Sequence, residues 1–394
     1  MSEWKTEALG KIARTTSGGT PDKKHPEYYG GSIPWVRSGE LDKGLITDTE
    51  IKITQAGLDN SSAKIFPEGT LLIALYGATI GKIAFLGIPA ATNQAVCTIF
   101  ENEKVSLKYL YYFLLFKRPD LIKQGVGGAQ PNISQAILKR LPVHYPTSLT
   151  EQQRIVARIE ELFSQLDSGV ETLRKTKQQL AVYRQAVLKE AFNPKQDWKF
   201  AMASEIGEVC LGRQRSPDNI SNLYPTKYIR AANITESGID AHDVLEMEFT
   251  PAERDKYYLR YNDIVISEAS GSKTQVGKPA LWKGEIENCC FQNTVIRHRV
   301  EHQNPTFIFW QYKFLYLSGY FAREVGGVGI NHIGAKNFSR IRLAIAPIGK
   351  QNAIVEKIES QLSVCDSIEQ TVDAALQQAE ALRQSILKQA FEEG

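Results

Sequence analysis

One sequence pattern occurs twice in the chain, as QQRIVARIEELFSQLDSGVETLRKTKQQLAVYRQAVLKEAF at residues 152–192 and as QNAIVEKIESQLSVCDSIEQTVDAALQQAEALRQSILKQAF at residues 351–391. The two stretches share 17 identical residues over 41 positions without a gap, at a constant offset of 199. Such self-similarity indicates an internal repeat. Because the offset is close to half of the 394 residues, the chain is interpreted as two copies of one plan.

The segments ahead of these stretches also correspond, although more loosely. Trp4-Lys5 matches Trp198-Lys199, and Trp35-Val36-Arg37 matches Tyr228-Ile229-Arg230. Each copy is therefore predicted to hold a globular unit followed by one long helix, with Pro194 marking the join between the copies. The expected domains are residues 1–149, 150–193, 194–348 and 349–394, which alternate between globular unit and helix.

Apolar residues in both long stretches recur at alternating spacings of four and three, which is the pattern of a coiled-coil seam. The first seam consists of Ile155, Ile159, Leu162, Leu166, Leu173, Leu180 and Val187, with Gly169, Thr176 and Tyr183 in the gaps. The second and thinner seam consists of Ile354, Ile358, Cys365, Val372, Ala379, Leu382 and Ile386. Thr150 is the expected N-cap of the first helix, with Gln153 at the capping-box position.

A helix of about 41 residues is about 60 Å long, so most of an isolated seam would face water. If the two copies are related by an internal two-fold axis, that axis reverses one helix relative to the other. The helices are then expected to form an antiparallel coiled coil with a globular unit at each end. In the alternative interpretation, each helix packs on its own globular unit.

The globular units contain short apolar runs separated by Gly, Pro and Asn, a pattern typical of strands in a mixed domain. In the first copy the predicted strands are Ile33–Val36, Thr70–Leu75, Ile83–Leu86 and Ala95–Phe100. Leu107–Phe116 and Thr306–Leu317 are predicted helices. The expected fold class is therefore α/β (α+β), with two such units and two long helices.

The composition is that of a folded protein, with 42% hydrophobic and 23% charged residues. The five cysteines form no Cys-x-x-Cys pair, which disfavours a zinc site or a disulfide framework. The first residues lack the pattern of a signal peptide, and Leu71–Ala91, the most apolar stretch, is interrupted by Lys82 and Pro89. A cytoplasmic protein without a membrane span is expected.

Several segments partly match known enzyme motifs, but each match is incomplete. Gly77–Lys82 is one residue shorter than a phosphate-binding loop, and Gly271–Lys278 is one residue longer. Asn304–Phe307 is similar to an amino-methyltransferase motif but has Thr306 where that motif requires proline. His298 and His302 lack the intervening glutamate of a metalloprotease helix. No catalytic or metal-binding residue is therefore assigned.

Polar loops recur at matched positions in the two copies. Arg37–Glu40 corresponds to Arg230–Asn233, Tyr76–Thr79 to 269–273, and 125–132 to 326–332. Glycine lets a backbone approach a partner closely, and Arg, Asn, Gln, Ser and Lys are side chains that contact base edges. The predicted DNA contacts are Arg37, Ser38, Glu40, Tyr76, Thr79, Lys82, Asn93, Gln94, Gln130, Asn132, Arg230, Asn233, Ser270, Ser272, Lys273, Lys278, Asn293, Asn331 and His332.

The formal net charge is only +3. Neutralisation of phosphates supplies much of the affinity of proteins for DNA, so a chain this weakly basic is expected to bind DNA poorly alone. Its affinity is expected to depend on partner subunits.

Several strings, taken together, resemble one family. The first copy contains SGGTP at 17–21, IPWVRSGE at 33–40, ALYGATIGK at 74–82 and QPNI at 130–133, and its long helix begins with EQQRI at 151–155. The second copy contains YIRAANI at 228–234 and SGSK at 270–273. The chain resembles the DNA-specificity subunit of type I restriction–modification systems. The second copy departs from the pattern at Arg215–Pro217 and at 325–332, which leaves open whether both units contact DNA alike.

The resemblance implies that 1–149 and 194–348 are target-recognition domains, each reading one half of a bipartite, asymmetric site in double-stranded DNA, with the helices setting the gap. It also implies two methyltransferase subunits and further restriction (motor–nuclease) subunits as partners. S-adenosylmethionine, ATP and Mg²⁺ are then expected in those partners, and no cofactor in this chain. Two other interpretations stay open at this point: a coiled-coil adaptor that binds proteins, and a stand-alone DNA-modifying enzyme with an unusual site.

Overall fold

The structure is a computed structural model that describes residues 3–125, 132–214, 223–324 and 331–392. The chain forms two compact units, and we call Met1–Leu173 with Ala374–Gly394 unit 1 and Arg174–Asp373 unit 2. The long helices α5 (Leu149–Ala191) and α10 (Ile348–Glu392) each contribute to both units. Among the described residues, no helix has the length and apolar character needed to cross a membrane.

Unit 1 is a mixed α/β domain. Its elements ahead of α5 are β1 (Trp4–Ala8), α1 (Leu9–Ile12), β2 (Thr15–Ser17), η1 (Pro26–Tyr28), β3 (Tyr29–Val36), η2 (Ser38–Lys43), β4 (Leu45–Ile46), β5 (Lys52–Ile53), α2 (Gln55–Asp59), β6 (Ile65–Phe66), β7 (Leu71–Ala74), η3 (Gly77–Thr79), β8 (Ile83–Leu86), β9 (Ala90–Thr92), β10 (Val96–Ile99), α3 (Leu107–Lys123), α4 (Gln135–Arg140) and β11 (Pro142–Pro146). The strands form sheets in the orders β2-β10-β7-β8-β4 and β5-β3-β9-β6, and β1 pairs with β11.

Unit 2 repeats this plan. Between the long helices it contains β12 (Lys199–Met202), η4 (Ala203–Glu205), β13 (Gly207–Leu211), β14 (Pro225–Ile229), η5 (Ala231–Asn233), β15 (Ile234–Thr235), β16 (Gly238–Ile239), β17 (Leu245–Glu248), α6 (Pro251–Tyr257), β18 (Ile264–Ser267), β19 (Ala269–Ser270), η6 (Lys273–Gln275), β20 (Pro279–Leu281), β21 (Cys290–Phe291), β22 (Val295–Val300), α7 (Pro305–Leu317), α8 (Tyr320–Glu324), β23 (Asn331–His332), α9 (Ala335–Phe338) and β24 (Arg342–Ile345). Its main sheets have the orders β13-β22-β18-β20 and β17-β14-β21.

The predicted strands and helices of the globular units are confirmed. The four apolar runs of the first copy coincide with β3, β7, β8 and β10. Every residue of β7 and β10 is buried, which explains why these strands are continuous apolar runs without alternation. The predicted helices coincide with α3 and α7, although α3 continues to Lys123 with Pro119 inside it.

The first long helix begins earlier than expected. Ser148, not Thr150, occupies the capping position: its hydroxyl accepts the backbone N–H of Glu151 at 3.4 Å, and its carbonyl accepts that of Gln152 at 3.1 Å. Thr150 already lies within α5. Serine is somewhat preferred to threonine at this position, which agrees with the earlier start, and Gln152 of the same turn is fully buried.

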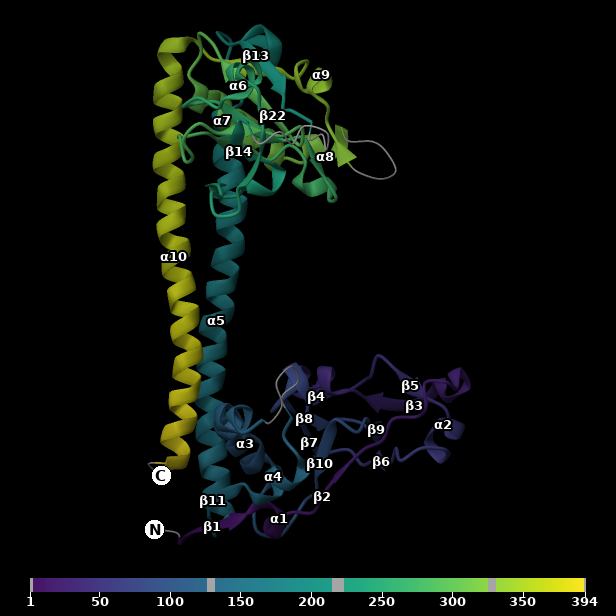
Figure 1. Cartoon of the computed structure of the whole chain (residues 1–394). Helices are drawn as coiled ribbons and strands as arrows, with labels where there is room; N and C mark the ends of the chain where they lie inside the picture. The colour runs from purple at the N-terminus through teal and green to yellow at the C-terminus, as the bar shows by residue number, and fades with distance from the viewer. Residues whose placement is uncertain (1–2, 126–131, 215–222, 325–330, 393–394) are drawn as a thin grey trace. The chain divides into compact units, whose positions relative to one another are not determined.

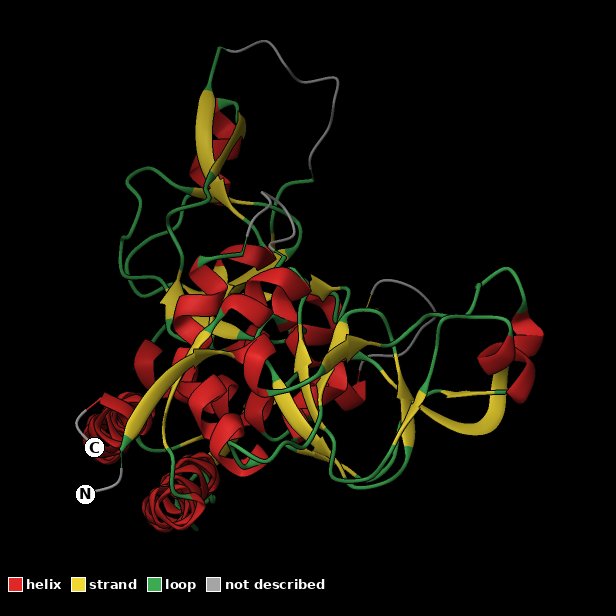
Figure 2. Cartoon of the chain, turned by 90° about the horizontal axis from the view of Figure 1, so that it is seen from below, coloured by secondary structure: helices red, strands yellow, loops and turns green. Residues whose placement is uncertain are grey.

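The predicted antiparallel pairing of α5 with α10 is confirmed, and the packing places the helices side by side (Figures 1 and 2). In unit 2, Lys177 donates to Asp373 at 2.7 Å and Lys357 donates to Glu190 at 2.9 Å, so the α10 partner number falls as the α5 number rises. The first turns of α5 also pack on their own unit, since Ile155 and Ile159 belong to the core of unit 1. α5 therefore packs on its own globular unit in its first turns and pairs with α10 further along, so each of the two interpretations holds for one part of the helix.

One column of the predicted α5 seam is confirmed only in part. Thr176 is partly buried as predicted, with Lys177 beside it, but Gly169 and Tyr183 are exposed and their neighbours Val170 and Arg184 are partly buried instead. The pattern of apolar residues missed them because the seam is completed here by long basic side chains, whose stems pack while their charged ends pair with α10. In α10, the predicted seam residue Leu382 is half exposed, and the neighbouring Arg383 is partly buried instead.

The end of each long helix packs in a globular core. In unit 1, the ring of Phe391 lies 5.2 Å from that of Tyr109 and 5.7 Å from that of Phe116. In unit 2, Phe192 lies 5.4 Å from Phe307 and 6.1 Å from Phe314 in the same way. The core of unit 1 is thus completed by the last residues of α10, and that of unit 2 by the last residues of α5.

Candidate nucleic-acid interface

The first predicted loop of unit 1 begins at the carboxyl end of a parallel strand pair. β3 runs parallel to β9, with Val36 opposite Thr92, and the backbone N–H of Asn93 donates to the carbonyl of Val36 at 2.9 Å. Arg37 and Asn93 therefore leave the sheet at the same edge, where ligands commonly bind in open α/β sheets. Ser38 is partly exposed and Gln94 is exposed beside them.

The other two predicted loops of unit 1 meet each other. Tyr76 and Asn132 form an isolated antiparallel bridge, and the hydroxyl of Thr79 donates to the carbonyl of Tyr76 at 2.7 Å. Lys82 forms an ion pair with Asp42 of η2, the turn that follows Arg37. The fold therefore gathers the predicted loops of unit 1 into one region, whereas the predicted contact Gln130 lies outside the described residues.

Unit 2 builds the same edge. β14 runs parallel to β21, with Ile229 opposite Phe291, and the backbone N–H of Gln292 donates to the carbonyl of Ile229 at 2.9 Å. The backbone N–H of Ala231 donates to the hydroxyl of Thr294 at 3.1 Å. Arg230 and the partly exposed Asn293 consequently leave the sheet together, as Arg37 and Asn93 do in unit 1.

The remaining predicted residues of unit 2 come together on the small sheet β19–β23. Ser270 pairs with Asn331, and Ala269 pairs with His332. Ser272, Lys273 and His332 are exposed, but Asn331 is buried. Their meeting repeats the bridge between Tyr76 and Asn132, so the matched loops of the two copies occupy matched places.

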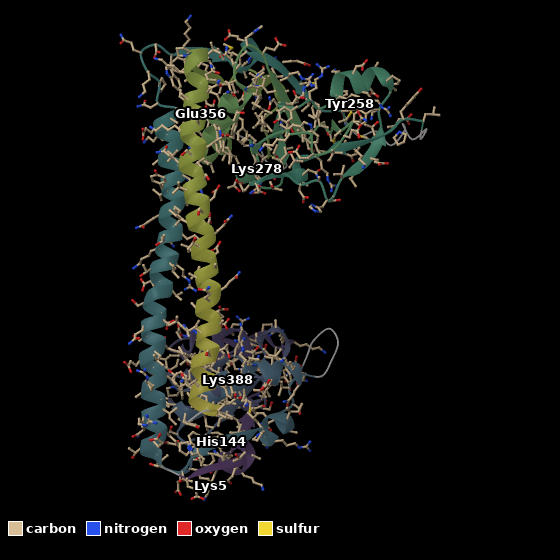
Figure 3. The ribbon with its side chains drawn as sticks, turned by 90° about the vertical axis from the view of Figure 1, so that its left-hand side faces the viewer. Lys5, His144, Tyr258, Lys278, Glu356 and Lys388 are labelled. Atoms are coloured by element: carbon tan, nitrogen blue, oxygen red, sulfur yellow. The ribbon has the colours of Figure 1, made fainter. Side chains whose placement is uncertain are left out.

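The assignment of Lys278 as a DNA contact needs correction. Lys278, marked in Figure 3, is buried, and its ammonium nitrogen lies 3.8 Å from the carboxylate of Glu236. Glu236 also accepts hydrogen bonds from Lys313 at 2.9 Å and from Tyr316 at 3.1 Å. Lys278 is thus a buried side chain whose ammonium faces the exposed carboxylate of Glu236, in the loop after β15.

Glu40 and Asn233 also need correction. Glu40 is 5% exposed, and its two carboxylate oxygens accept the backbone N–H groups of Arg37 at 2.9 Å and Glu50 at 3.0 Å. Asn233 is 2% exposed and accepts the backbone N–H of Arg230 at 3.0 Å. Buried polar side chains with their hydrogen bonds made inside the fold cannot also contact bases, so both residues shape the loop instead.

Arg37 and Arg230 are held by acidic residues that the sequence interpretation missed. Arg37 pairs with Glu50, and Arg230 pairs with Asp243. The Nε atoms of both arginines are buried and have no hydrogen-bond partner among the described residues. The missed signal was the spacing: Glu50 and Asp243 both lie 13 positions after their arginine.

Glu268 is a further buried acid in the interface region of unit 2. Its carboxylate accepts the backbone N–H of Gly334 at 3.1 Å and lies 3.5 Å from Nδ1 of His332. Burial raises the pKa of the Glu268 carboxyl, because desolvation disfavours the charged form. The repeat offered no signal for it, since Leu75 takes the equivalent place in unit 1.

The side chains that could hold a metal ion are spread apart in the part of the chain that the structure describes. No cluster of three or more His, Cys, Asp or Glu side chains that could hold a metal ion is found there. All five cysteines are free and buried, and burial raises the pKa of Cys289 and of Cys290 to about 12. Thiols with such pKa values are poor nucleophiles near neutral pH.

Comparison with known proteins places this arrangement in a family. A family model described as the type I restriction modification DNA specificity domain matches residues 1–180 and again residues 195–378, so each copy of the repeat matches once. The chain belongs to this family.

Named relatives of this DNA specificity family align along much of the chain. The StySPI specificity subunit of Salmonella potsdam is 25% identical over 98% of this chain and 88% of its own length. The EcoKI specificity subunit of Escherichia coli K12 is 24% identical over 91% of this chain and 82% of its own. The EcoR124I/EcoR124II specificity subunit of Escherichia coli is 29% identical over 43% of each chain.

Solved structures share the fold of the DNA specificity family across the whole chain. The HsdS subunit of Thermoanaerobacter tengcongensis superimposes with a TM-score of 0.58 at 16% identity, covering 98% of this chain and 96% of that one. A chain from a structure of type I R-M system assembly reaches a TM-score of 0.77 at 16% identity, covering 98% of this chain and 97% of that one. At this identity the likeness concerns the fold alone.

Proposed function

We propose that this chain selects the DNA target of a type I restriction–modification complex, with each unit reading one half of a bipartite, asymmetric site in double-stranded DNA. The observation that carries the proposal is the repetition of one loop arrangement in both units. In each, an arginine and an asparagine follow a parallel strand pair, Arg37 with Asn93 and Arg230 with Asn293. The side chains differ between the copies elsewhere, which supports two different half-sites.

The helix pair α5–α10 is proposed to set the distance between the half-sites. Reciprocal ion pairs support an internal two-fold relation: Asp167 pairs with Arg383 in unit 1, and Asp366 pairs with Arg184 in unit 2, each residue at an offset of 199 from its counterpart. Two half-sites read from one side of B-DNA are about one helical turn apart. A stiff helical spacer suits that requirement, because the gap then depends on helix length.

The chemistry of the complex is assigned to partner subunits. The internal repeat offers two equivalent surfaces, which supports two methyltransferase subunits per chain, with restriction subunits joining through that assembly. S-adenosylmethionine, ATP and Mg²⁺ are proposed to bind in those partners, while this non-catalytic chain fixes the register on DNA as the methyltransferase extrudes its target base. The proposed location is the cytoplasm.

Co-expression of the chain with its methyltransferase subunit tests this function. Single-molecule sequencing of the host genome is expected to reveal one methylated motif made of two specific halves with a fixed gap. The chain alone, incubated with Mg²⁺ or S-adenosylmethionine, is expected neither to cut nor to methylate DNA. A genome with no sequence-specific methylation in the presence of both subunits would reject the proposal, and activity of the chain alone would favour a stand-alone enzyme.

A further inference from the structure

Each unit contains the same three-residue arrangement around one arginine. Unit 1 uses Arg37, Glu40 and Glu50, and unit 2 uses Arg230, Asn233 and Asp243. All three positions are related by the same offset of 193, although the segments between them fold differently, with β4 in unit 1 and β15–β16 in unit 2. An arrangement kept in both copies while its surroundings differ is a candidate for a shared role.

A buried side chain ties the arginine to its acidic partner through the backbone. In unit 1, Glu40 accepts the backbone N–H groups of both Arg37 and Glu50. In unit 2, Asn233 accepts the backbone N–H of Arg230, and its amide nitrogen donates to the carbonyl of Asp243 at 2.9 Å. Glu40 and Asn233 thus both link the backbone of the arginine to the backbone of its acidic partner, although their hydrogen bonds differ. The main chains of each arginine and its acid are fixed relative to one another before any ligand arrives.

Each guanidinium is held by its acidic partner at one nitrogen while the side chain stays partly exposed. In both arginines Nη2 donates to the acid, and Nε is buried without a partner among the described residues. The side chains remain partly exposed, at 41% for Arg37 and 28% for Arg230. A guanidinium can present two parallel N–H groups, which match the O6 and N7 acceptors of guanine in the major groove.

The charges favour a base over the DNA backbone as the ligand. A guanidinium paired with a carboxylate has no net charge as a pair, so it gains little from neutralising a phosphate. Base reading depends instead on the direction of the donors, and a carboxylate that fixes this direction sharpens it.

We propose that Glu50 and Asp243 are positioning residues that lock Arg37 and Arg230 in the orientation that reads one guanine in each half of the DNA target. The inference rests on the proposed function and adds to it the residue pair and the base. Glu50 and Asp243 act through the arginines and do not contact the DNA.

The test uses the full chain co-expressed with its methyltransferase subunit and mapping of methylated motifs in the genome. E50Q and R37K are each expected to relax the specificity at the same G·C base pair in one half of the motif. Discrimination against the other base pairs is expected to fall about tenfold or more at that position. D243N and R230K are expected to do so in the other half. E50D, which installs the acid that unit 2 uses naturally, is expected to keep the motif of the wild type.

Matched controls are E68Q in unit 1 and E287Q in unit 2, since both glutamates are exposed; neither change is expected to alter the motif. Relaxation of different base pairs by E50Q and R37K would overturn the inference, because Glu50 would then contact DNA itself. Loss of specificity at an A·T base pair would contradict the inference that the arginine contacts guanine. Weakening at all positions alike would indicate a phosphate or folding role. Failure of the proposed function is distinct from these outcomes, since the wild-type pair of subunits would then produce no motif.

Discussion

Gln152, in the first turn of α5, accepts the backbone N–H of Ser106 at 2.9 Å through its side-chain oxygen, and Ser106 is the N-cap of α3. Its side-chain nitrogen donates to the carbonyls of Lys104 and Pro146, both at 2.9 Å. Gln351 makes the equivalent bond to Asn304, the N-cap of α7, at 2.8 Å. Both glutamines are fully buried, so in each unit one side chain joins the start of a long helix to the start of a domain helix.

Replacing this glutamine is expected to destabilise its unit strongly. Q152A leaves the N–H of Ser106 and two carbonyls without partners in a buried site, which is expected to cost about 3 kcal/mol of unfolding free energy. Q153A, one residue further along and exposed, is the matched control and is expected to change stability by less than about 0.5 kcal/mol. Urea unfolding of the purified chain measures both; equal effects would contradict the role of Gln152.

The helix ends are expected to stabilise the units to which they dock. F391A removes a ring that packs on Tyr109 and Phe113, and such deletions cost about 3 to 5 kcal/mol. Amide hydrogen exchange is expected to show loss of protection in α3, far along the chain, and no loss in α7. F200A serves as the control because Phe200 is 56% exposed. Loss confined to the last turns of α10 would mean that Phe391 frays without consequence.

The reciprocal ion pairs of α5 and α10 are expected to couple weakly. Arg383 pairs with Asp167 at a partly exposed site, where such pairs contribute about 0.2 to 1 kcal/mol. A double-mutant cycle with R383M and D167N is expected to give a coupling energy of about 0.5 kcal/mol at low salt, which falls at 1 M salt because ions screen exposed charges. A coupling that does not change with salt would show that the contact is not electrostatic.

Unit 2 is expected to lose stability in acid through His298. This histidine is fully buried, its Nδ1 lies 2.9 Å from the hydroxyl of Tyr312, and burial lowers its pKa to about 4. The unfolded chain takes up the proton near pH 6.5, and the folded chain does so only near pH 4. Stability therefore falls as the pH drops through this window, by about 3 kcal/mol in total.

The matched variant for this window is H298Q, which cannot be protonated, with the exposed H302Q as control. Hydrogen exchange of β22 measured at pH 7 and pH 4.5 gives the opening free energy at each pH. The wild type and H302Q are expected to lose more stability than H298Q between the two values. Equal losses in all three would assign the acid sensitivity to other groups.

Shortening both long helices is expected to shorten the gap between the half-sites. Deleting Arg174–Lys177 together with Asp373–Leu376 removes four residues at equivalent places, about 6 Å of each helix. The seam spacing stays at three or four residues across the cut, so pairing is expected to persist. Methylome sequencing is expected to show a gap shorter by one or two base pairs, and an unchanged gap would contradict the role of the helices as the spacer.

Most of the correct predictions of the fold and of the polar loops followed from the internal repeat. An offset of 199 between Phe192 and Phe391 predicted equivalent helices, and a two-fold relation between equivalent helices requires antiparallel pairing, as the ion pairs of Arg184 and Arg383 bear out. Buried strands such as β7 were recognisable because a strand covered on both faces is an unbroken apolar run. The three polar loops were found because the same loop occurs twice.

The wrong predictions of site and seam residues concern polar side chains that are buried or partly buried and bonded within the protein. Glu40 and Asn233 have the composition of DNA contacts, and only their burial reveals that they brace a loop. Lys177 and Arg184 were left out of the seam because a search for apolar residues does not count the methylene stems of basic side chains. Burial and partnership depend on residues far away in sequence, so neither property was visible along the chain.

The docking of Phe391 has a consequence for how the protein is made. Ile386, Leu387 and Phe391 belong to the core of unit 1, whose other residues are translated before those of the core of unit 2. Domains commonly fold in order of synthesis, but here the unit translated first is the one finished last. A change at Ile386, Leu387 or Phe391 therefore acts on unit 1, while every core residue of unit 2 already precedes these three in the chain.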